Sequence, residues 1–333
     1  KVQRHSTESL IRMLWDVGLT IGHSVRTLRD CISQSRNDVT VMTNLLESRV
    51  LAGNAELLSQ LKLRTGIDQM WPAAKYLEAK IKEQSDRHLR YDDTAYNLEP
   101  QIKEGPGGLR DIQTIGWVTH RALSQQGLRY LISYDFLTEG EYRTLVRGRN
   151  FLWKIRNALH FASGRSEDRL LFDYQREIAQ QFGYKDTTTL AVEKLMKRYY
   201  RTAGEIRLLN MIVLQQLHAA TNPELRNRKH VSTDLNRRFF MKNGLIEIRN
   251  SNEFRKSPFA LLEVFLLLQQ HPSLKGIGVD TIRLIRENLF RIDAEFRQDP
   301  RCRRLFVEIL RAPLGQTRAL RQMNAYGILG AYI

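Results

Sequence analysis

The sequence predicts a mainly helical protein with a small α/β portion at its start and a short β insertion late in the chain. Three observations support this. Long stretches place apolar residues at helical spacing. Strand-like alternation occurs in only two short segments, so the recurring strands of a parallel βαβ fold are missing. With 333 residues and 42% hydrophobic content, the chain is also long enough to form sizeable cores in about two domains.

The start of the chain combines helices with one expected strand. Residues 1–15 have the apolar spacing of a helix. Residues 16–26, "DVGLTIGHSVR", alternate between apolar and small or polar residues and predict a strand of a small sheet. After this segment, either Asn37 or Asp38 is expected to cap a helix that ends at Gly53.

Amphipathic helices are expected through most of the remaining chain. Their predicted ranges are 71–91, 109–126, 138–163, 187–219, 258–271, 280–296 and 301–311. The main interruption contains "RRFFMKNGLIEIRN", which alternates around Asn243-Gly244, a favoured two-residue hairpin turn. We therefore expect one small hairpin within a helical domain.

The charge balance favours a polyanionic partner. Lys and Arg number 52 against 36 Asp and Glu, which gives a formal net charge of +16 and a pI of about 10.0. Nucleic acid, nucleotide phosphates and an acidic membrane surface would all suit this charge. Basic residues beside Glu at helical spacing, such as Lys197 after Glu193, also fit a solvated helix surface.

Other features bear on location and completeness. Cys31 and Cys302 lack metal-ligand spacing and fit a reducing, cytoplasmic location. The apolar run at 259–270 is interrupted by Glu263 and is too short to cross a bilayer, so no membrane partner is expected. The chain starts without Met or a signal peptide and stops on an apolar stretch, so we expect it to be cut from something longer.

The most informative stretch is "KEGPGGLRDI", residues 103–112. Pro106 fixes its φ angle, while Gly107 and Gly108 tolerate positive φ and close backbone approach. The pattern predicts a tight loop that feeds the N-terminus of a helix, where free N–H groups favour an anion. It is neither a phosphate-binding P-loop nor a dinucleotide fingerprint, because the required Lys-Ser/Thr pair and the preceding strand are absent.

Charged residues flank this turn. Lys103 lies in the loop and Arg110 in the first helical turn, and Asp111 could cap the helix or orient Arg110. The alternative is a purely structural turn in which Asp111 compensates the helix dipole. Spacing alone does not decide between these interpretations.

The stretch "YNLEPQIKEGPGGLRDIQTIGWV" resembles the segment that follows the catalytic domain in the bifunctional PII uridylyltransferase/uridylyl-removing enzymes of bacterial nitrogen control. Further similar segments occur in the same order: "LWDVGLTIGHSVRTL", "DVTVMTNLLESRVLAG", "EQSDRHLRYDDTAYNLEP", "LWKIRNALHF", "DRLLFDYQ" and "LFVEIL". A related glycine motif occurs in glutamine synthetase adenylyltransferases, but it continues with an acidic-aromatic pair where this chain has Gln113-Thr114.

The resemblance implies a domain order. It makes 1–65 the end of a polymerase-beta-like nucleotidyltransferase domain, 66–312 a helical substrate-binding domain, and 313–333 a linker to an HD hydrolase domain. Such enzymes transfer UMP from UTP to a tyrosine of the PII signalling protein with Mg²⁺, and the HD domain removes it. This chain has neither the Gly-Ser followed by Asp-x-Asp of the transferase metal site nor the His-Asp pair of the hydrolase site. We therefore expect the metal-binding carboxylates and the hydrolase site to lie outside this chain. The chain alone should be catalytically inactive.

The resemblance also suggests binding residues. Lys103, Gly107, Gly108, Arg110 and Asp111 are expected to close a nucleotide or acceptor cleft. His23 and Arg26 lie where related transferases place a late sheet strand, and they would contact phosphate or line the sheet edge. The third carboxylate of those transferases has no counterpart, because Gly22, His23 and Ser24 occupy the positions.

Weaker candidates lie further along the chain. Arg156 and His160 share a helix face, where a packed core histidine is expected. Arg165, Asp168 and Arg169 suggest a loop ion-pair network. Basic and aromatic residues mix in 226–230 and 237–243, which leaves open a second function, a stand-alone helical nucleic-acid-binding module with steep salt dependence. The ordered motifs favour the uridylyltransferase and make nucleic acid an unlikely partner.

Overall fold

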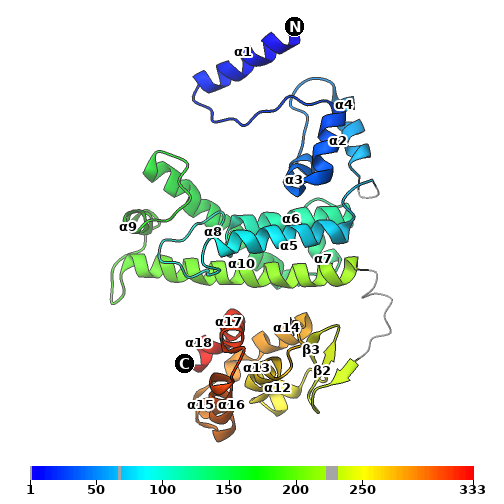
Figure 1. Cartoon of the computed structure of the whole chain (residues 1–333). Helices are drawn as coiled ribbons and strands as arrows, with labels where there is room; N and C mark the ends of the chain where they lie inside the picture. Colours follow the sequence, from blue (N-terminus) through cyan, green and yellow to red (C-terminus); the bar gives the residue numbers. More distant parts are fainter. Residues whose placement is uncertain (1, 67–68, 223–231) are drawn as a thin grey trace. The chain divides into compact units, whose positions relative to one another are not determined.

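The computed structural model describes residues 2–66, 69–222 and 232–333 (Figure 1). The chain forms two compact units, Lys1–Pro72 and Ala73–Ile333. Both units are mainly helical, which confirms the mainly helical part of the predicted fold class but not its α/β portion at the start of the chain. Within the described residues, none of the helices is long and apolar enough to cross a membrane.

The first unit contains four helices: α1 (Val2–Asp16), α2 (Leu28–Asn37), α3 (Val39–Leu46) and α4 (Ala55–Arg64). Thr27 caps α2 in a capping box with Asp30, and Asp38 caps α3 by accepting two backbone N–H bonds. Helix α2 packs against α3 and α4 over a small core that includes Met42 and Leu61. The N-cap prediction at Asp38 is therefore confirmed.

Two expectations for this unit are wrong. Residues 19–27 are outside any helix or strand, because a strand needs a second strand as its partner and none of the described strands pairs with them. Val25, expected on a sheet, is 80% exposed. Helix α3 ends at Leu46 rather than at Gly53, which lies in the following loop with φ +97°.

The second unit begins with a helical bundle. Its elements are α5 (Ala73–Leu89), α6 (Leu109–Leu123), α7 (Tyr130–Ser133), α8 (Glu139–Ser163), α9 (Phe172–Gln181) and α10 (Ala191–Thr221). The long helix α10 packs against α5, α6, α8 and α9 (Figure 1), and its Leu195 and Tyr199 are buried. The four long predicted helices of this region are confirmed, whereas the short α7 and α9 were not foreseen.

The remainder of this unit carries the β insertion. A sheet in the order β1-β2-β3-β4 joins Ser232–Asp234, Phe239–Lys242, Leu245–Ile248 and Gly276–Ile277. Asn243 and Gly244 have φ values of +54° and +80°, which confirms the two-residue hairpin turn. Strand β4 adds in parallel to β3, a pairing that local sequence could not reveal.

Helices complete the second unit: α12 (Glu253–Lys256), α13 (Ala260–Gln270), α14 (Val279–Glu287), the 3₁₀ helix η1 (Leu289–Arg291), α15 (Ala294–Gln298), α16 (Pro300–Arg311), α17 (Gln316–Tyr326) and α18 (Ile328–Tyr332). The single helix expected at 280–296 is broken, since α14 ends before Asn288 and Asp293 caps a new helix. Residues 313–333 also differ from the expected linker. Tyr326 is buried, and α17 packs on α13.

Candidate functional site

The glycine turn is folded tightly against helix α10. Gly107 has φ +75°, and a Cβ atom there would lie 2.6 Å from the carbonyl carbon of Ala203 on α10. At Gly108, a Cβ would come within 2.8 Å of carbonyl oxygens in its own loop. Both positions therefore exclude a side chain for steric reasons, and the turn packs against α10 rather than leaving space for a ligand at the glycines.

The N-terminus of α6 is closed by the same loop. Its first three N–H groups donate to loop carbonyls at 2.8 to 3.2 Å, from Leu109 to Ile102, Arg110 to Lys103 and Asp111 to Gly108. The expectation of free N–H groups facing an anion is therefore wrong for these three donors. The structural alternative, a sharp turn with Asp111 at the helix start, describes this geometry better.

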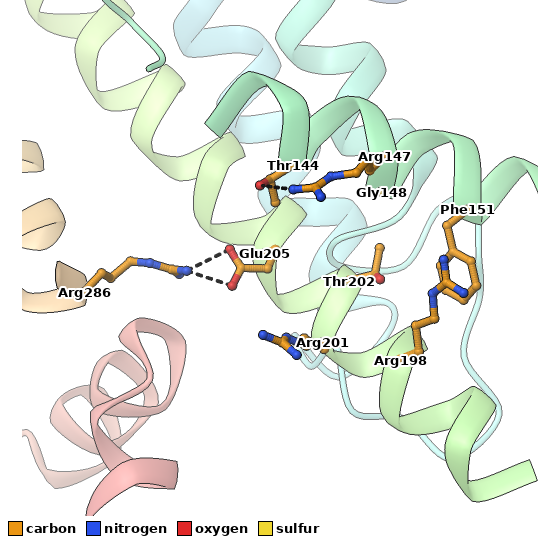
Figure 2. Close-up of a pocket in the computed structure, with 9 residues that line it drawn as sticks. All are labelled: Thr144, Arg147, Gly148, Phe151, Arg198, Arg201, Thr202, Glu205 and Arg286. Atoms are coloured by element: carbon orange, nitrogen blue, oxygen red, sulfur yellow. Dashed lines mark hydrogen bonds and ion pairs between the residues drawn. The ribbon is translucent and has the colours of Figure 1, made fainter. Parts of the chain in front are cut away.

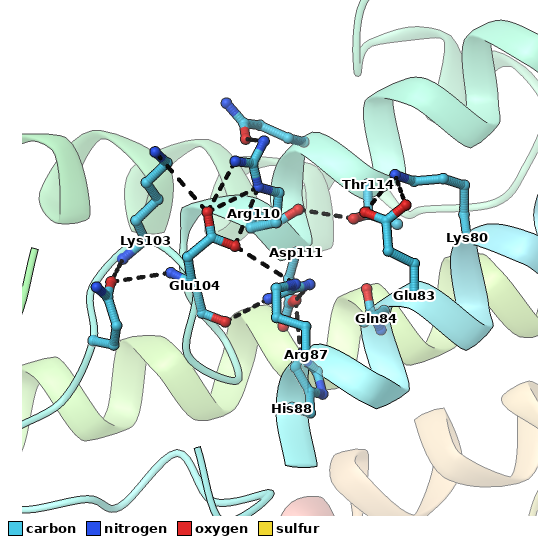
Figure 3. Close-up of polar contacts among 12 residues, drawn as sticks. Lys80, Glu83, Gln84, Arg87, His88, Lys103, Glu104, Arg110, Asp111 and Thr114 are labelled. Atoms are coloured by element: carbon cyan, nitrogen blue, oxygen red, sulfur yellow. Dashed lines mark hydrogen bonds and ion pairs between the residues drawn. The ribbon is translucent and has the colours of Figure 1, made fainter. Parts of the chain in front are cut away.

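Asp111 is the centre of a buried polar network (Figure 3). Its side chain is fully buried, and Oδ1 accepts from Arg87 Nη2 at 2.7 Å and lies 2.9 Å from His88 Nε2. Its Oδ2 accepts the Gly107 N–H at 2.7 Å, so Asp111 holds the turn in place rather than capping α6, which has no side-chain cap. It does not orient Arg110.

The charge of Asp111 is held in place by its partners. Burial alone would raise its pKa, but the hydrogen bond to His88 and the charges of His88 and Arg87 outweigh this and leave the pKa below its ordinary value. Arg87 also donates to the Glu104 carbonyl oxygen at 2.6 Å. The buried ion pair thus joins α5, the glycine loop and α6. Removing Asp111 would leave the buried Arg87 with only the Glu104 carboxylate, whose Oε2 lies 3.8 Å from Arg87 Nε.

Helix α10 is tied to the same network by amides. Asn210 donates to the Asp111 carbonyl oxygen at 2.9 Å and exchanges hydrogen bonds with Gln84 of α5 at 2.7 and 3.2 Å. Gln84, His88 and Asn210 also line a cavity of about 1540 Å³ in the second unit. The inner side of the network therefore borders a space large enough for a small molecule.

Lys103 and Arg110 form the outer edge of the site. The Arg110 Nη2 lies 2.9 Å from Glu104 Oε1, and its Nη1 donates to Gln113. Lys103 Nζ lies 3.9 Å from the same Glu104 oxygen, and the two basic side chains keep exposures of 33% and 27%. This edge can meet solvent and a ligand, although Glu104 offsets one of its two positive charges.

A second polar cluster joins this edge from α8. Arg156 Nε lies 2.5 Å from Asp168 Oδ1, and His160 Nε2 lies 3.2 Å from the same atom. The Ile102 N–H donates to the Asp168 carbonyl oxygen at 2.8 Å, which brings this cluster beside the glycine loop. His160 is 28% exposed and bound to a carboxylate, so the expected core histidine is wrong.

Asp168 is also held ionised. Burial would raise its pKa, but hydrogen bonds from Arg156 and His160, with the charges of Arg156 and Lys103, keep the pKa below its ordinary value. The predicted loop ion pairs are present, with partners that sequence did not name: Arg165 pairs with Glu167, and Arg169 with Glu99.

The other sequence candidates are placed as follows. His23 and Arg26 lie on the exposed segment of the first unit, with the His23 ring 5.5 Å from Trp15, and their phosphate contact stays a prediction. Residues 226–230 fall outside the described residues, while Arg238 of 237–243 pairs with Glu263. Both cysteines are free, and the described ranges contain no cluster of three or more His, Cys, Asp or Glu suited to a metal.

Comparison with protein-family models identifies the class to which these features belong. The model described as GlnD PII-uridylyltransferase matches residues 75–214, which contain the glycine turn, the Asp111 network and the Arg156–Asp168 pair. The model described as the third domain of the uridylyltransferase GlnD matches residues 239–332. The second unit is thus a helical region of the uridylyltransferase type.

Curated relatives match along almost the whole chain. Bifunctional uridylyltransferase/uridylyl-removing enzymes are 45% identical over 99% of this chain in Pseudomonas aeruginosa and 48% identical over 100% in Nitrosococcus oceani. This chain therefore belongs to the family of bifunctional uridylyltransferase/uridylyl-removing enzymes. It spans 37% of the length of these relatives. No solved structure matches it.

Proposed function

We propose that this chain is the central segment of an enzyme that transfers UMP from UTP to a tyrosine of the PII signalling protein and also removes it by hydrolysis. One observation carries the proposal. Segments that match the family in sequence order fold into a single polar site, in which Arg87, Asp111 and Asp168 come from three separate motifs. Because the segments that this chain shares with the family come together in one polar site, a role shared with the family explains the similarity better than chance does.

The polar site gives the segment a structural and a binding role. The Asp111 network fixes the glycine turn, and this turn sets the positions of Lys103 and Arg110 at the exposed edge. We place these two side chains against the nucleotide or the acceptor protein, since a guanidinium and an ammonium group suit phosphate or carboxylate oxygens. Gly107, Gly108 and Asp111 then act through positioning, not through contact.

The catalytic carboxylates and the Mg²⁺ they would bind belong, on this proposal, to parts of the enzyme outside the chain. Residues 1–65 would close the polymerase-beta-like nucleotidyltransferase domain, and an HD domain would supply the hydrolysis. The isolated chain is then inert. Incubating it with PII, UTP and Mg²⁺ should give no modified PII, whereas transfer of UMP would contradict this assignment.

A segment exchange tests the function directly. The 331 aligned residues of the Pseudomonas aeruginosa enzyme are replaced by this chain, and transfer to PII and removal from it are measured with labelled UTP. The corresponding Nitrosococcus oceani segment, exchanged in the same way, is the control for tolerance of the junctions. We expect both activities in both chimeras. A folded chimera with this chain that is inactive beside an active control would overturn the proposal.

The same chimera tests the binding edge. Arg110→Ala should raise the KM for UTP or for PII by about tenfold or more, because a charge-assisted hydrogen bond is lost. Arg304→Ala, which removes an exposed arginine paired with Glu308 on α16, is the matched control and should change neither KM. Unchanged kinetics in the Arg110 variant would remove Arg110 from the binding site while leaving the family function intact.

A further inference from the structure

A second cavity of the same unit has a strongly positive lining. It has a volume of about 530 Å³ and lies among α8, α10 and α14. Four arginines line it, namely Arg147, Arg198, Arg201 and Arg286, together with a single carboxylate, Glu205 (Figure 2). Gly148 lets α8 approach α10 here, because a Cβ at this position would lie 3.1 to 3.2 Å from Ile206 and Thr202.

The one carboxylate neutralises only one of the arginines. Glu205 accepts two hydrogen bonds from Arg286 Nη2, at 2.7 and 2.9 Å. Arg147 donates to neutral oxygens on its own helix, and Arg198 contacts the Tyr184 hydroxyl and the Phe151 ring. Figure 2 draws no contact to Arg201 from the other residues that line the cavity.

Several half-buried or buried arginines of this unit have carboxylate partners: Arg87 with Asp111, Arg156 with Asp168, Arg207 with Asp93, Arg238 with Glu263, and Arg283 with Glu141. The cavity arginines Arg147, Arg198 and Arg201 are exposed and have no such partner among the described residues. Arg198 and Arg201, three residues apart on α10, instead repel each other across one helix face. A cavity lined by like charges concentrates its potential and attracts anions.

We propose that this cavity binds an oligophosphate chain, either inorganic or as the phosphate part of a nucleoside triphosphate. Its volume lies within the range of about 300 to 1,000 Å³ that is usual for small-molecule sites. Guanidinium groups match phosphate oxygens in paired hydrogen bonds, and three of them lack a carboxylate partner among the described residues. The site is separate from the edge formed by Lys103 and Arg110, so it does not depend on the proposed function.

The lining also indicates what the site does not recognise. Phe151 is the one aromatic residue among those that line the cavity, it is only 6% exposed, and the Arg198 guanidinium lies 4.2 Å above its ring. No aromatic face is therefore open for a base to stack on. Phosphate contacts should dominate, and the identity of the base should matter little.

Calorimetric titration of the whole 333-residue chain with tripolyphosphate, UTP and ATP tests the site. We expect one saturable site for each ligand, with dissociation constants that agree within about threefold and rise with salt. Arg201→Gln should weaken binding by about tenfold or more, since it removes a charged donor. Glu205→Gln should tighten binding, because it frees Arg286 for the ligand. Arg304→Gln, with the same loss of charge outside the cavity, should leave binding unchanged.

The other outcomes overturn the proposal. Absence of saturable binding would do so, as would equal weakening by Arg201→Gln and Arg304→Gln, which is the behaviour of diffuse surface charge. UTP binding at least tenfold tighter than ATP and tripolyphosphate would show recognition of the base. Binding of single-stranded nucleic acid or polyglutamate that Arg201→Gln weakens, without tripolyphosphate binding, would make the cavity part of a docking surface for acidic polymers.

Discussion

The turn at Gly107 allows a sharp test of how the site is built. Its φ of +75° costs an L-amino acid about 1 to 2 kcal/mol. A methyl group at this position would also lie 2.6 Å from the Ala203 carbonyl carbon and 2.9 Å from its Cα, so the loop or α10 must move. Overpacking of this kind costs about 1 to 3 kcal/mol. We expect Gly107→Ala to lose about 2 to 5 kcal/mol of the free energy of unfolding.

Gly164 provides a matched control for the backbone term. Its φ is +65°, and a Cβ there would meet no atom within 4 Å. Gly164→Ala should therefore lose only the conformational cost of about 1 to 2 kcal/mol. The difference between the two variants isolates the collision with α10, because both glycines have nearly the same φ.

Urea unfolding followed by circular dichroism gives the free energies, and hydrogen exchange of peptides from 101–111 and 196–206 localises the effect. We expect faster exchange in both segments for Gly107→Ala and in neither for Gly164→Ala. Equal losses in the two variants would refute the packing argument and leave only the strain of positive φ. Slowed or unchanged hydrogen exchange at 196–206 in Gly107→Ala would also contradict a steric contact between the turn and α10.

Three further predictions concern carboxylates. Asp111→Asn should lose about 3 to 5 kcal/mol in urea unfolding at pH 7, because the buried Arg87 keeps only the more distant Glu104 carboxylate. Glu139→Gln, which breaks an exposed pair, should lose at most about 1 kcal/mol. Similar losses in the two variants would contradict the assigned role of Asp111. Since the folded pKa values of Asp111 and Asp168 lie below the ordinary 3.8, the unfolded chain takes up protons first as the pH falls. Their contribution to stability is complete above about pH 4 and lost below it, so the urea midpoint should drop less steeply with acid in Asp111→Asn than in the parent chain. Burial, aided by the charge of Asp280, raises the pKa of Glu247, so its ionised form destabilises the folded chain at pH 7. Glu247→Gln should therefore unfold at a higher urea concentration than the parent chain at pH 7. This gain in stability should vanish at pH 3, where the glutamate is protonated.

Sequence patterns were reliable where a helix is defined by its own residues. Apolar spacing placed α5, α6, α8 and α10 within a few residues, and the Asn243-Gly244 pair placed the hairpin, because both signals are local. The strand expected at 16–26 failed for the opposite reason. A strand exists only if another segment supplies hydrogen bonds, and the alternation of side chains does not guarantee such a partner.

The candidate site shows the same division. The sequence drew attention to the turn at 103–112 and to its family likeness, and it named Asp111 as a cap. Asp111 instead accepts the Gly107 N–H, which lies before the N-cap Gly108, and α6 has no side-chain cap, so the cap prediction is wrong. The alternative in which Asp111 orients Arg110 is wrong, because Arg110 pairs with Glu104, which reaches it only when the loop folds back over the first turn of α6.

The sequence by itself therefore determined the helical class, the positions of the main helices and the family, since periodicity and motifs lie within short stretches of chain. The tertiary structure decided what each motif does. Asp111 meets Arg87 across 24 residues and Asn210 across 99, and the unpaired arginines of the second cavity come together from α8 and α10. Such contacts depend on packing between distant segments, which buries charges, closes a helix N-terminus and leaves other charges uncompensated.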